Sequence, residues 1–361
     1  MLSTGKLNVI HELKFNSIYA EISNKDFCAL GFALGDSLDV IFSNGFRMDD
    51  VPYYDGFYVK TGQYIVSGYP SYPYVSVGMN NRAIWPVAGL RENGETVEIV
   101  LHEKGKYLAT QEAFSQKHPP DRSYYVSDEA FANFRCLEAP NLREGFFIRG
   151  GSPVCDDVGS MRTADDLIRR HNVRFVLNLA DNDEELAESI KACEGFYIGE
   201  LYQEGRIVCL DLSANPLDPV YAQKLCGGFR EMLRVGEGPV YFHCVEGKDR
   251  TGFCSILLMA LGDGGYAEFE KDYMMTYQNF YYIDREHTPE KYRLIRDLYL
   301  DGFNMNFLCR TEDETDFSGY DFYRKAVEYL RFGGMTEDEI RRLIAYVRKE
   351  GDVPSPQTAW T

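Results

Sequence analysis

The stretch Val240-Tyr-Phe-His-Cys-Val-Glu-Gly-Lys-Asp-Arg-Thr-Gly-Phe253 combines a short apolar run, a glycine-containing loop and the beginning of an apolar segment. The first three residues predict a buried strand, and the residues from about Arg250 onward predict a helix. Five residues separate Cys244 from Arg250, and Thr251 follows, which gives the pattern C-x5-R-T. A strand, loop and helix in this order place the loop beyond the carboxyl end of the strand in an α/β sheet.

A loop of this length wraps around a tetrahedral dianion so that successive backbone N–H groups point inward. The following helix directs its positive end to the same place, and Arg250 grips two phosphate oxygens through its planar guanidinium. Cys244 begins the loop, where Arg250 and the converging N–H groups favour the thiolate. Gly247 lets the backbone turn where a Cβ would crowd it. The predicted phosphate-binding residues of this loop are Val245, Glu246, Gly247, Lys248 and Thr251.

Three further side chains have predicted supporting roles. The Thr251 hydroxyl is placed to donate to the Cys244 sulfur and help it leave again. We expect His243 to brace the loop through its ring nitrogens, because a cysteine thiolate needs no general base, and Gly252 to support the helix start. The alternative is a buried cysteine and an unrelated surface arginine. It leaves the surrounding strand, glycines and helix unexplained.

The segment from His243 to Gly252 resembles the signature of cysteine-dependent protein tyrosine and dual-specificity phosphatases. Its Gly247-Lys-Asp-Arg-Thr251 ending is most similar to the bacterial tyrosine/lipid phosphatase branch. Ala132-Asn-Phe-Arg135 and Gly145-Phe-Phe-Ile-Arg-Gly-Gly-Ser152 resemble the family's opening segments. The resemblance covers roughly residues 131–361. It implies a phosphomonoester hydrolase that works through a Cys244 thiophosphate, without metal or cofactor, on phosphotyrosine, with phosphoserine, phosphothreonine and phosphoinositide as further candidates.

The reaction also needs an acid that protonates the leaving alcohol and later acts as a base toward water. In the wider family this acid is an aspartate on a loop upstream of the cysteine, which corresponds here to Asp211 or Asp218. In the Gly-Lys-Asp-Arg branch the loop aspartate has this role, which corresponds to Asp249. Asp218 is equally suited to cap the helix that follows it. The sequence leaves these three alternatives open.

The charged residues of the loop affect whether a substrate with more than one phosphate can bind. Lys248 could attract a second phosphate or an acidic head group, and in the similar branch it accompanies phosphoinositide activity. Glu246 opposes this, since a carboxylate at the rim repels polyphosphorylated substrates. Arg135 and Arg149 match family arginines near the pocket, with structural ion pairs as an equal alternative.

Two other functions compete with a protein phosphatase. One is a cysteine-type inositol-polyphosphate phosphatase, which a deep and strongly basic pocket would favour. The other is a phosphate-binding module without catalysis. Because the chain keeps both Cys244 and Arg250, catalysis is favoured over mere binding.

Residues 1–118 predict a small all-β domain, either a barrel or a compact sandwich. Apolar and polar residues alternate in 7–22, which predicts one half-buried strand, and in 97–101, and turn signals occur at Asn44-Gly45 and Asp55-Gly56. Gly35-Asp-Ser-Leu-Asp-Val40 and the tyrosine-rich stretch after it resemble the C-terminal β-domain of bacterial S-adenosylmethionine hydroxide adenosyltransferases. We interpret the tyrosines between residues 53 and 74 as cover for strands, with a stacking surface for a ring or sugar as the alternative.

Pro119-Pro120 begins a predicted linker, 119–130, after which helix and strand signals alternate in the predicted phosphatase domain, 131–361. This pattern predicts a mostly parallel sheet flanked by helices, followed by a helical C-terminal extension. The expected strands are 174–179, 196–198, 207–210 and 239–243. The expected helices are 163–171, from 182, 221–233, 266–282, 289–299, 320–332 and 336–351. The segment with Tyr277, Phe280, Tyr281 and Tyr282 is either a lid over the pocket or ordinary packing.

The composition of the chain indicates which binding partners and which cellular location to expect. The chain has 361 residues and a formal net charge of −18, which argues against nucleic acid and against stable association with anionic membranes. Nine cysteines without a C-x2-C pair predict reduced thiols and no zinc site. The first residues carry Lys6, Glu12 and Lys14 and lack a signal-peptide core, so we expect a cytoplasmic protein. The expected partner is a phosphorylated protein, or a phospholipid or inositol substrate.

Overall fold

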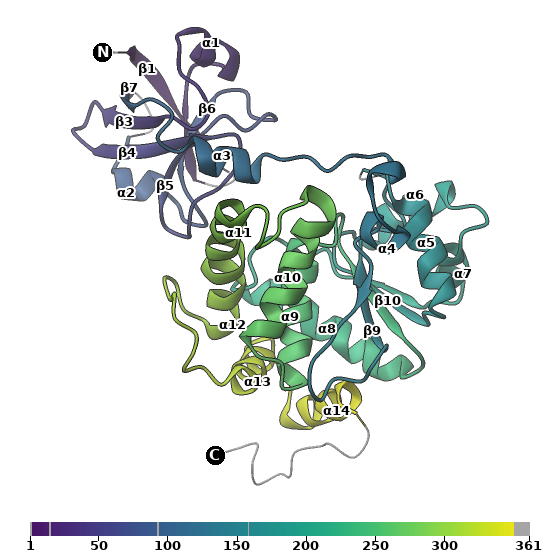
Figure 1. Cartoon of the computed structure of the whole chain (residues 1–361). Coiled ribbons are helices and arrows are strands. Elements are labelled where there is room, and N and C mark those ends of the chain that lie inside the picture. The colour runs from purple at the N-terminus through teal and green to yellow at the C-terminus, as the bar shows by residue number, and fades with distance from the viewer. Residues whose placement is uncertain (1, 14–15, 92–93, 158, 350–361) are drawn as a thin grey trace. The chain divides into compact units, whose positions relative to one another are not determined.

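The computed structural model describes residues 2–13, 16–91, 94–157 and 159–349 (Figure 1). The chain divides into two compact units. The first comprises Met1–Gln116 and Thr288–Phe303, and the second comprises Lys117–His287 and Asn304–Thr361. The first unit therefore includes a segment that lies far along the chain, between two parts of the second.

The first unit is built on a closed barrel in the strand order β1-β2-β6-β5-β4-β3-β7. Every neighbouring pair is antiparallel except β4 and β5, which are parallel. Of the two predicted arrangements, barrel and sandwich, the structure has the barrel. Its strands are β1 Ser3–Glu12, β2 Ser17–Ala20, β3 Ser37–Phe42, β4 Arg47–Tyr54, β5 Tyr64–Ser67, β6 Val75–Met79 and β7 Thr96–Glu103.

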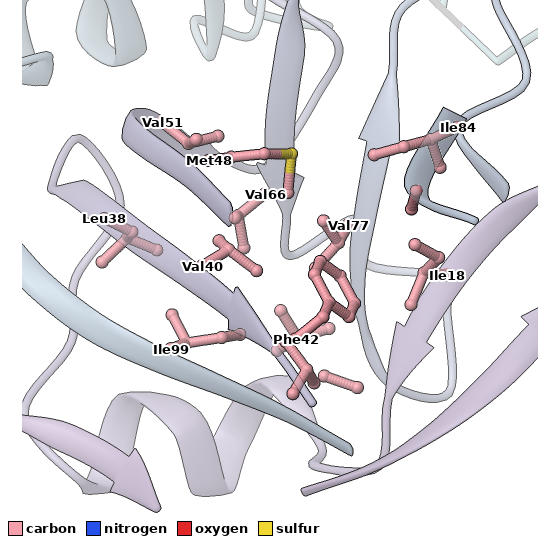
Figure 2. Packing of buried hydrophobic residues seen from close by; sticks show 14 of the residues in the cluster. Ile18, Leu38, Val40, Phe42, Met48, Val51, Val66, Val77, Ile84 and Ile99 are labelled. Atoms are coloured by element: carbon pink, nitrogen blue, oxygen red, sulfur yellow. The ribbon is translucent and has the colours of Figure 1, made fainter. Parts of the chain in front are cut away.

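Alternating apolar residues of these strands meet in the barrel interior, as Figure 2 shows for Leu38, Val40 and Phe42 of β3. The unit is not purely β, because short helices accompany the strands. Helices this short carry too little periodicity to be read from a sequence. They are α1 Asn24–Ala29, α2 Trp85–Ala88, α3 Leu108–Phe114 and α11 Pro289–Ile295, the last continuing into a π-helix, Arg296–Met305.

The second unit contains a five-stranded sheet in the order β11-β10-β12-β9-β8. The first four strands are parallel neighbours, and β8 pairs antiparallel with β9, so the predicted mostly parallel sheet is confirmed. The strand that precedes the Cys244–Arg250 loop, β12, lies in the middle. The strands are β8 Arg135–Cys136, β9 Phe147–Gly150, β10 Phe175–Asn178, β11 Ile207–Cys209 and β12 Val240–His243.

Helices cover both faces of this sheet (Figure 1). On one face Val176 and Tyr241 pack against α5, α6 and α7, and on the other α8 and α9 lie over the strands. The predicted helical C-terminal region is confirmed. The helices are α4 Asp128–Phe131, α5 Met161–Arg170, α6 Asp183–Ser189, α7 Tyr197–Gln203, α8 Pro219–Val235, α9 Asp249–Leu261, α10 Tyr266–Tyr281, α12 Asn306–Cys309, α13 Phe322–Phe332 and α14 Glu337–Val347.

Some predicted elements were wrong. Residues 196–198 do not form a strand, because α7 begins at Tyr197. The carboxylate of Asp165 on α5 accepts the N–H groups of Tyr197 and Ile198 at 2.9 and 2.8 Å, and so satisfies the first turn of α7. The predicted start of α5 at Thr163 is two residues late, since the helix begins at Met161.

Candidate active site

The Cys244–Arg250 loop follows β12 directly, at the carboxyl end of the central strand, and α9 begins inside it at Asp249. Cys244 is buried, with 5% of its surface exposed. Gly247 has φ +69°, and a Cβ added there would lie 2.2 Å from the carbonyl oxygen of Gly150 on β9. The turn therefore requires glycine on two grounds, the backbone conformation and the close approach of β9.

Each carbonyl oxygen from Cys244 to Lys248 accepts a hydrogen bond from a donor outside the phosphate cradle. The donors are His243 Nδ1 to Cys244 (3.0 Å), Ser152 N to Val245 (2.9 Å), Asn133 Nδ2 to Glu246 (3.2 Å) and Gly247 (3.1 Å), Arg149 Nη2 to Gly247 (2.6 Å) and Gly252 N to Lys248 (2.7 Å). In a trans peptide the C=O and the next N–H point in opposite directions. Donors that hold the carbonyls from outside therefore favour N–H groups turned toward the inside of the loop, the arrangement that an anion nest needs.

The imidazole of His243 lies against the first peptide of the loop, with Nδ1 at 3.0 Å from the carbonyl oxygen of Cys244. His243 is buried, and burial lowers the pKa of its imidazole to about 4, so the ring is neutral at physiological pH. Because the carbonyl of Cys244 can only accept, Nδ1 carries the hydrogen. The ring thus orients the first peptide of the loop.

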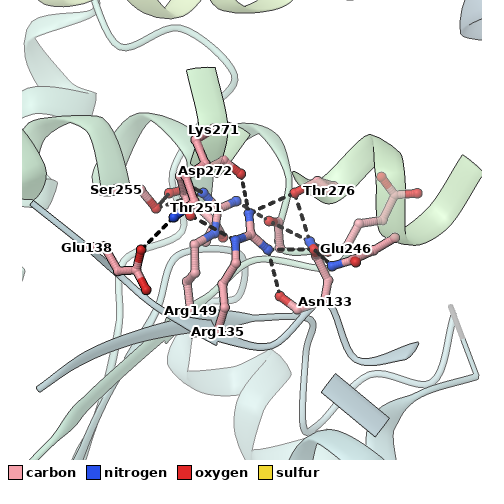
Figure 3. A network of polar contacts seen from close by, with 12 residues as sticks. Asn133, Arg135, Glu138, Arg149, Glu246, Thr251, Ser255, Lys271, Asp272 and Thr276 are labelled. Atoms are coloured by element: carbon pink, nitrogen blue, oxygen red, sulfur yellow. Dashed lines mark hydrogen bonds and ion pairs between the residues drawn. The ribbon is translucent and has the colours of Figure 1, made fainter. Parts of the chain in front are cut away.

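Behind the loop lies a buried network of polar side chains (Figure 3). The Arg149 side chain, 0% exposed, reaches Gly247 through Nη2 and binds both Ser255 and Asp272 through Nη1. Arg135 Nε donates to the same carboxylate at 2.8 Å. Burial alone would raise the pKa of Asp272, but the ion pairs with both arginines outweigh it and lower the pKa. Of the alternatives for these arginines, the structure has the structural ion pairs.

Asn133 extends this network into the loop. It is fully buried at φ +51°, and its amide donates to Thr276 Oγ1 at 3.1 Å as well as to the two loop carbonyls. The sequence prediction missed the roles of Asn133, Asp272 and Thr276. The available signal was a charged residue, Asp272, among the apolar and aromatic residues of α10, because a buried carboxylate needs cationic partners.

The Arg250 side chain makes hydrogen bonds beside the loop, whereas the Thr251 hydroxyl makes none with the described residues. Arg250 Nη1 donates to the carbonyl of Leu212 at 3.2 Å, after β11, and approaches that of Ala180, after β10, at 3.5 Å. The guanidinium therefore lies at the carboxyl ends of these neighbouring strands. The Thr251 hydroxyl is buried without a hydrogen-bond partner among the described residues, so the expected bond to the Cys244 sulfur is not formed.

The three aspartates considered as the acid have distinct surroundings. Asp218 caps α8 and accepts the N–H of Val220 at 2.9 Å. Asp211, at φ +41°, is 58% exposed and ion-paired with Lys224 at 2.9 Å. Asp249 stands on the loop itself, is 64% exposed, and lies 3.4 Å from the hydroxyl of Tyr273.

Comparisons with known proteins identify the family of this chain. A family model described as tyrosine phosphatase family matches residues 132–347. Similar solved structures include P. aeruginosa TpbA, with 18% identity over 45% of this chain and 87% of that one and a TM-score of 0.26. The cysteine variant of TpbA in complex with pTyr has 16% identity over 48% of this chain and 94% of that one and a TM-score of 0.28. Another is the core catalytic domain of the PP-IP phosphatase SIW14 from S. cerevisiae in complex with citrate. It has 14% identity over 46% of this chain and 88% of that one and a TM-score of 0.27. No curated protein matches the sequence. The chain belongs to the tyrosine phosphatase family.

Proposed function

We propose that this protein hydrolyses phosphotyrosine in phosphorylated proteins, with Cys244 as nucleophile, Arg250 as phosphate ligand and Asp249 as general acid. The observation that carries this proposal is the loop in which outside donors hold every carbonyl from Cys244 to Lys248. Such a loop presents preorganised N–H groups to the three equatorial oxygens of a phosphoryl group.

The reaction has two steps. The Cys244 thiolate attacks phosphorus in line with the leaving oxygen, the P–O bond breaks, and the Asp249 carboxyl group gives its proton to the leaving phenolate. Water then attacks the thiophosphate, the Asp249 carboxylate takes a proton from it, and the P–S bond breaks to return the thiolate. Arg250 and the loop N–H groups stabilise the equatorial oxygens in both steps.

The surroundings of the aspartates support Asp249 as the acid. The Asp218 carboxylate is used by the helix cap, and that of Asp211 by Lys224. Asp249 belongs to the loop, and its exposed carboxylate can exchange protons with water. Asp211 and Asp218 remain the alternatives that the experiments below separate.

An aromatic row on α10 supports an aryl phosphate as substrate. The rings of Tyr273, Tyr277 and Tyr281 follow one another with centroids 5.9 and 5.7 Å apart. The row begins beside Asp249 through Tyr273, and the Tyr281 phenol interacts electrostatically with Lys248 and the other charged side chains of the loop. Tyr273 and Tyr277 are buried, with 1% and 3% of their surface exposed, so a phosphotyrosine ring entering the loop would meet the row at Tyr281. We propose that Tyr281 is part of the pocket wall. The lid predicted for the segment with Tyr277, Phe280, Tyr281 and Tyr282 stays an alternative to ordinary packing.

The charges at the rim support a substrate with one phosphate. Lys248 Nζ lies 3.1 Å from Glu246 and 3.7 Å from Asp249, so carboxylates offset its charge. This arrangement disfavours inositol polyphosphates and phosphoinositides, which need uncompensated cations. Dual specificity toward phosphoserine and phosphothreonine stays a subordinate proposal.

We place the protein in the cytoplasm, without stable membrane association. The net charge of −18 supports this placement, since it disfavours anionic lipid surfaces. None of the helices in the described residues has the length and apolar character needed to cross a bilayer. The resemblance of the N-terminal residues to an adenosyltransferase β-domain, and the domain limits 1–118, 119–130 and 131–361, stay predictions.

The test is hydrolysis of p-nitrophenyl phosphate in EDTA by the wild type and by Cys244→Ser. Cys28→Ser, which changes an exposed cysteine of the barrel unit, is the matched control. Phosphotyrosine peptide, phosphoserine peptide and phosphoinositides are compared in parallel. We expect metal-independent turnover that Cys244→Ser abolishes and Cys28→Ser retains. Absence of turnover on every substrate, with inorganic phosphate still bound, would leave the phosphate-binding module.

A further inference from the structure

A pocket of about 400 Å³ lies between the ends of α8 and α14 and the residues just before β9. Its lining, which we call the arginine pocket, consists of Leu233, Ala345, Tyr346 and three arginines, Arg143, Arg342 and Arg348. None of these described lining residues is a carboxylate, although the chain carries a formal net charge of −18. A hollow lined by one sign of charge attracts ligands of the opposite sign whatever the net charge of the chain. The arginine pocket therefore favours an anion.

The arginine pocket lies at the opposite end of the sheet from the Cys244–Arg250 loop. Phe146 precedes β9, and its carbonyl oxygen accepts the N–H of Val240, the first residue of β12, at 2.8 Å. Cys244 follows the last residue of the same strand. The segment that carries Arg143 is joined to the end of α14, because the N–H of Arg143 donates to the carbonyl of Val347 at 2.9 Å. An anion in this pocket would therefore be distinct from a phosphate in the loop.

The Arg143 guanidinium is held in place by the protein itself. Its central carbon lies 3.6 Å from the centroid of the Phe146 ring, and Nη1 donates to the carbonyl of Tyr346 at 3.3 Å. A guanidinium that stacks on a ring keeps its N–H groups at the edge of its plane, where they can meet an anion. Apart from the bond to Tyr346, the N–H groups of Arg143 have no partner among the described residues. Arg143 is thus a preorganised donor.

The charges that remain unpaired decide which anion fits. Arg348 is buried and its guanidinium is ion-paired with Asp263, so its charge is offset. Glu339, one turn before Arg342 on α14, is ion-paired with an arginine of α8 at 2.7 Å and is not available to Arg342. Arg342 is exposed and has no ion pair or hydrogen bond within the part of the chain that the structure describes. Arg143 and Arg342 therefore keep two positive charges without an ion pair.

We propose that the arginine pocket binds a phosphoryl dianion, carried by a phosphomonoester or present as free phosphate. Two unpaired guanidinium groups match the charge of a dianion, and each can bind two oxygens of a phosphoryl group through its planar fork. A phosphoryl group has three acceptor oxygens to share between Arg143 and Arg342. A carboxylate has one charge and two oxygens, so it would leave one of the two arginines unmatched. The site shares no residue with the Cys244–Arg250 loop and does not depend on phosphatase activity.

The probe is inorganic phosphate, and titration calorimetry measures its binding to the full chain at constant ionic strength. Arg250→Met removes the phosphate ligand of the Cys244–Arg250 loop, so binding to this variant reports the arginine pocket. Arg342→Met is added to it and compared with Arg341→Met. Arg341 also lies on α14 but is ion-paired with Asp338 at 3.4 Å and does not line the pocket, so the two changes alter the net charge equally. The same pair is compared in Cys244→Ser, which keeps Arg250, so that the result does not rest on the folding of one variant.

We expect Arg250→Met to bind one phosphate. Arg342→Met should weaken that binding about tenfold or more, because hydrogen bonds to a charged group are lost, and Arg341→Met should leave it unchanged. In Cys244→Ser, the addition of Arg342→Met should remove one bound phosphate and the addition of Arg341→Met none. Equal effects of the two arginine variants, or no binding to Arg250→Met and no loss in Cys244→Ser, would overturn the site.

Two esters test the charge and the source of the ligand in Arg250→Met. Methyl phosphate is a dianion and should bind as inorganic phosphate does, whereas dimethyl phosphate carries one charge and should bind at least about tenfold more weakly. Equal binding of the diester would overturn the match to a dianion. Binding of inorganic phosphate without methyl phosphate would identify free phosphate as the ligand. Absence of turnover in the wild type, with these results intact, would refute the proposed function and leave the arginine pocket standing.

Discussion

Arg149 Nη2 donates to the carbonyl oxygen of Gly247 at 2.6 Å, from a side chain with no exposed surface. This bond joins β9 to the catalytic loop, and Asp272 on α10 holds the arginine from the other side. The conformation of the Cys244–Arg250 loop therefore depends on residues well outside the C-x5-R-T pattern.

Asp272→Asn is expected to destabilise the protein by about 3–5 kcal/mol, because it leaves two buried arginines without their carboxylate. It should also lower kcat, since Arg149 then no longer holds the loop. Urea unfolding and turnover of p-nitrophenyl phosphate measure the two effects. The control is Lys191→Met, which breaks an exposed ion pair with Glu188 and should shift stability by less than about 1 kcal/mol. Equal effects of the two variants would contradict the bracing role of Asp272.

Acidification should remove the contribution of Asp272 to stability. Its pKa is lowered in the folded state by Arg135 and Arg149, so the stabilisation is complete above the unfolded value of about 3.9. The stabilisation is lost as the pH falls through the folded pKa, below that value. The stability difference between wild type and Asp272→Asn, measured by urea unfolding, should stay constant from pH 7 to 5 and shrink below about pH 4. A stability difference that grew on acidification would mean that folding raises the pKa of Asp272. That result would refute its ion pairs with Arg135 and Arg149.

Gly247→Ala should abolish activity, because the new Cβ would meet the Gly150 carbonyl of β9 at 2.2 Å. Gly105→Ala is the matched control: its φ is +66°, but nothing lies within 4 Å of the added Cβ. The control should lose only the cost of a left-handed alanine, about 1–2 kcal/mol, and keep its turnover. If both variants were equally active, crowding by β9 would not be what requires glycine at 247.

Asp249→Asn should lower kcat about a hundredfold or more on phosphotyrosine peptide, the usual size of a general-acid effect. The loss should be smaller on p-nitrophenyl phosphate, whose leaving group needs no proton. Asp218→Asn should be nearly silent, because asparagine caps a helix as well as aspartate does. Asp211→Asn separates the remaining alternative: if it shows the leaving-group dependence and Asp249→Asn does not, the acid is Asp211.

Glu246→Gln should shift preference toward substrates with two phosphates. The change removes a carboxylate 3.1 Å from Lys248, so less negative charge offsets the ammonium toward a second phosphate. A charge at such a distance is worth about 1 kcal/mol in water, or about fivefold in the ratio of kcat/KM values. The ratio is measured between phosphotyrosine peptide and a phosphoinositide bisphosphate. An unchanged ratio would show that the ion pair does not select the substrate.

The Cys244–Arg250 loop could be predicted without the structure, because Cys244, Gly247 and Arg250 lie on one contiguous strand-loop-helix unit. Strand and helix patterns are local, so the mostly parallel sheet and the helical C-terminal region also followed from them. The strand expected at 196–198 was wrong, because a carboxylate of α5 supports a helix there, and a distant cap leaves no local pattern.

The contacts that hold the loop could not be predicted in this way. Asn133, Arg149 and Asp272 come from segments far apart in the chain, and their bonds form only when β8, β9 and α10 pack together. The same holds for the helix Pro289–Ile295, which follows α10 in sequence and belongs to the barrel unit. Contacts between distant segments depend on which surfaces are buried together, and no periodicity within one segment records that.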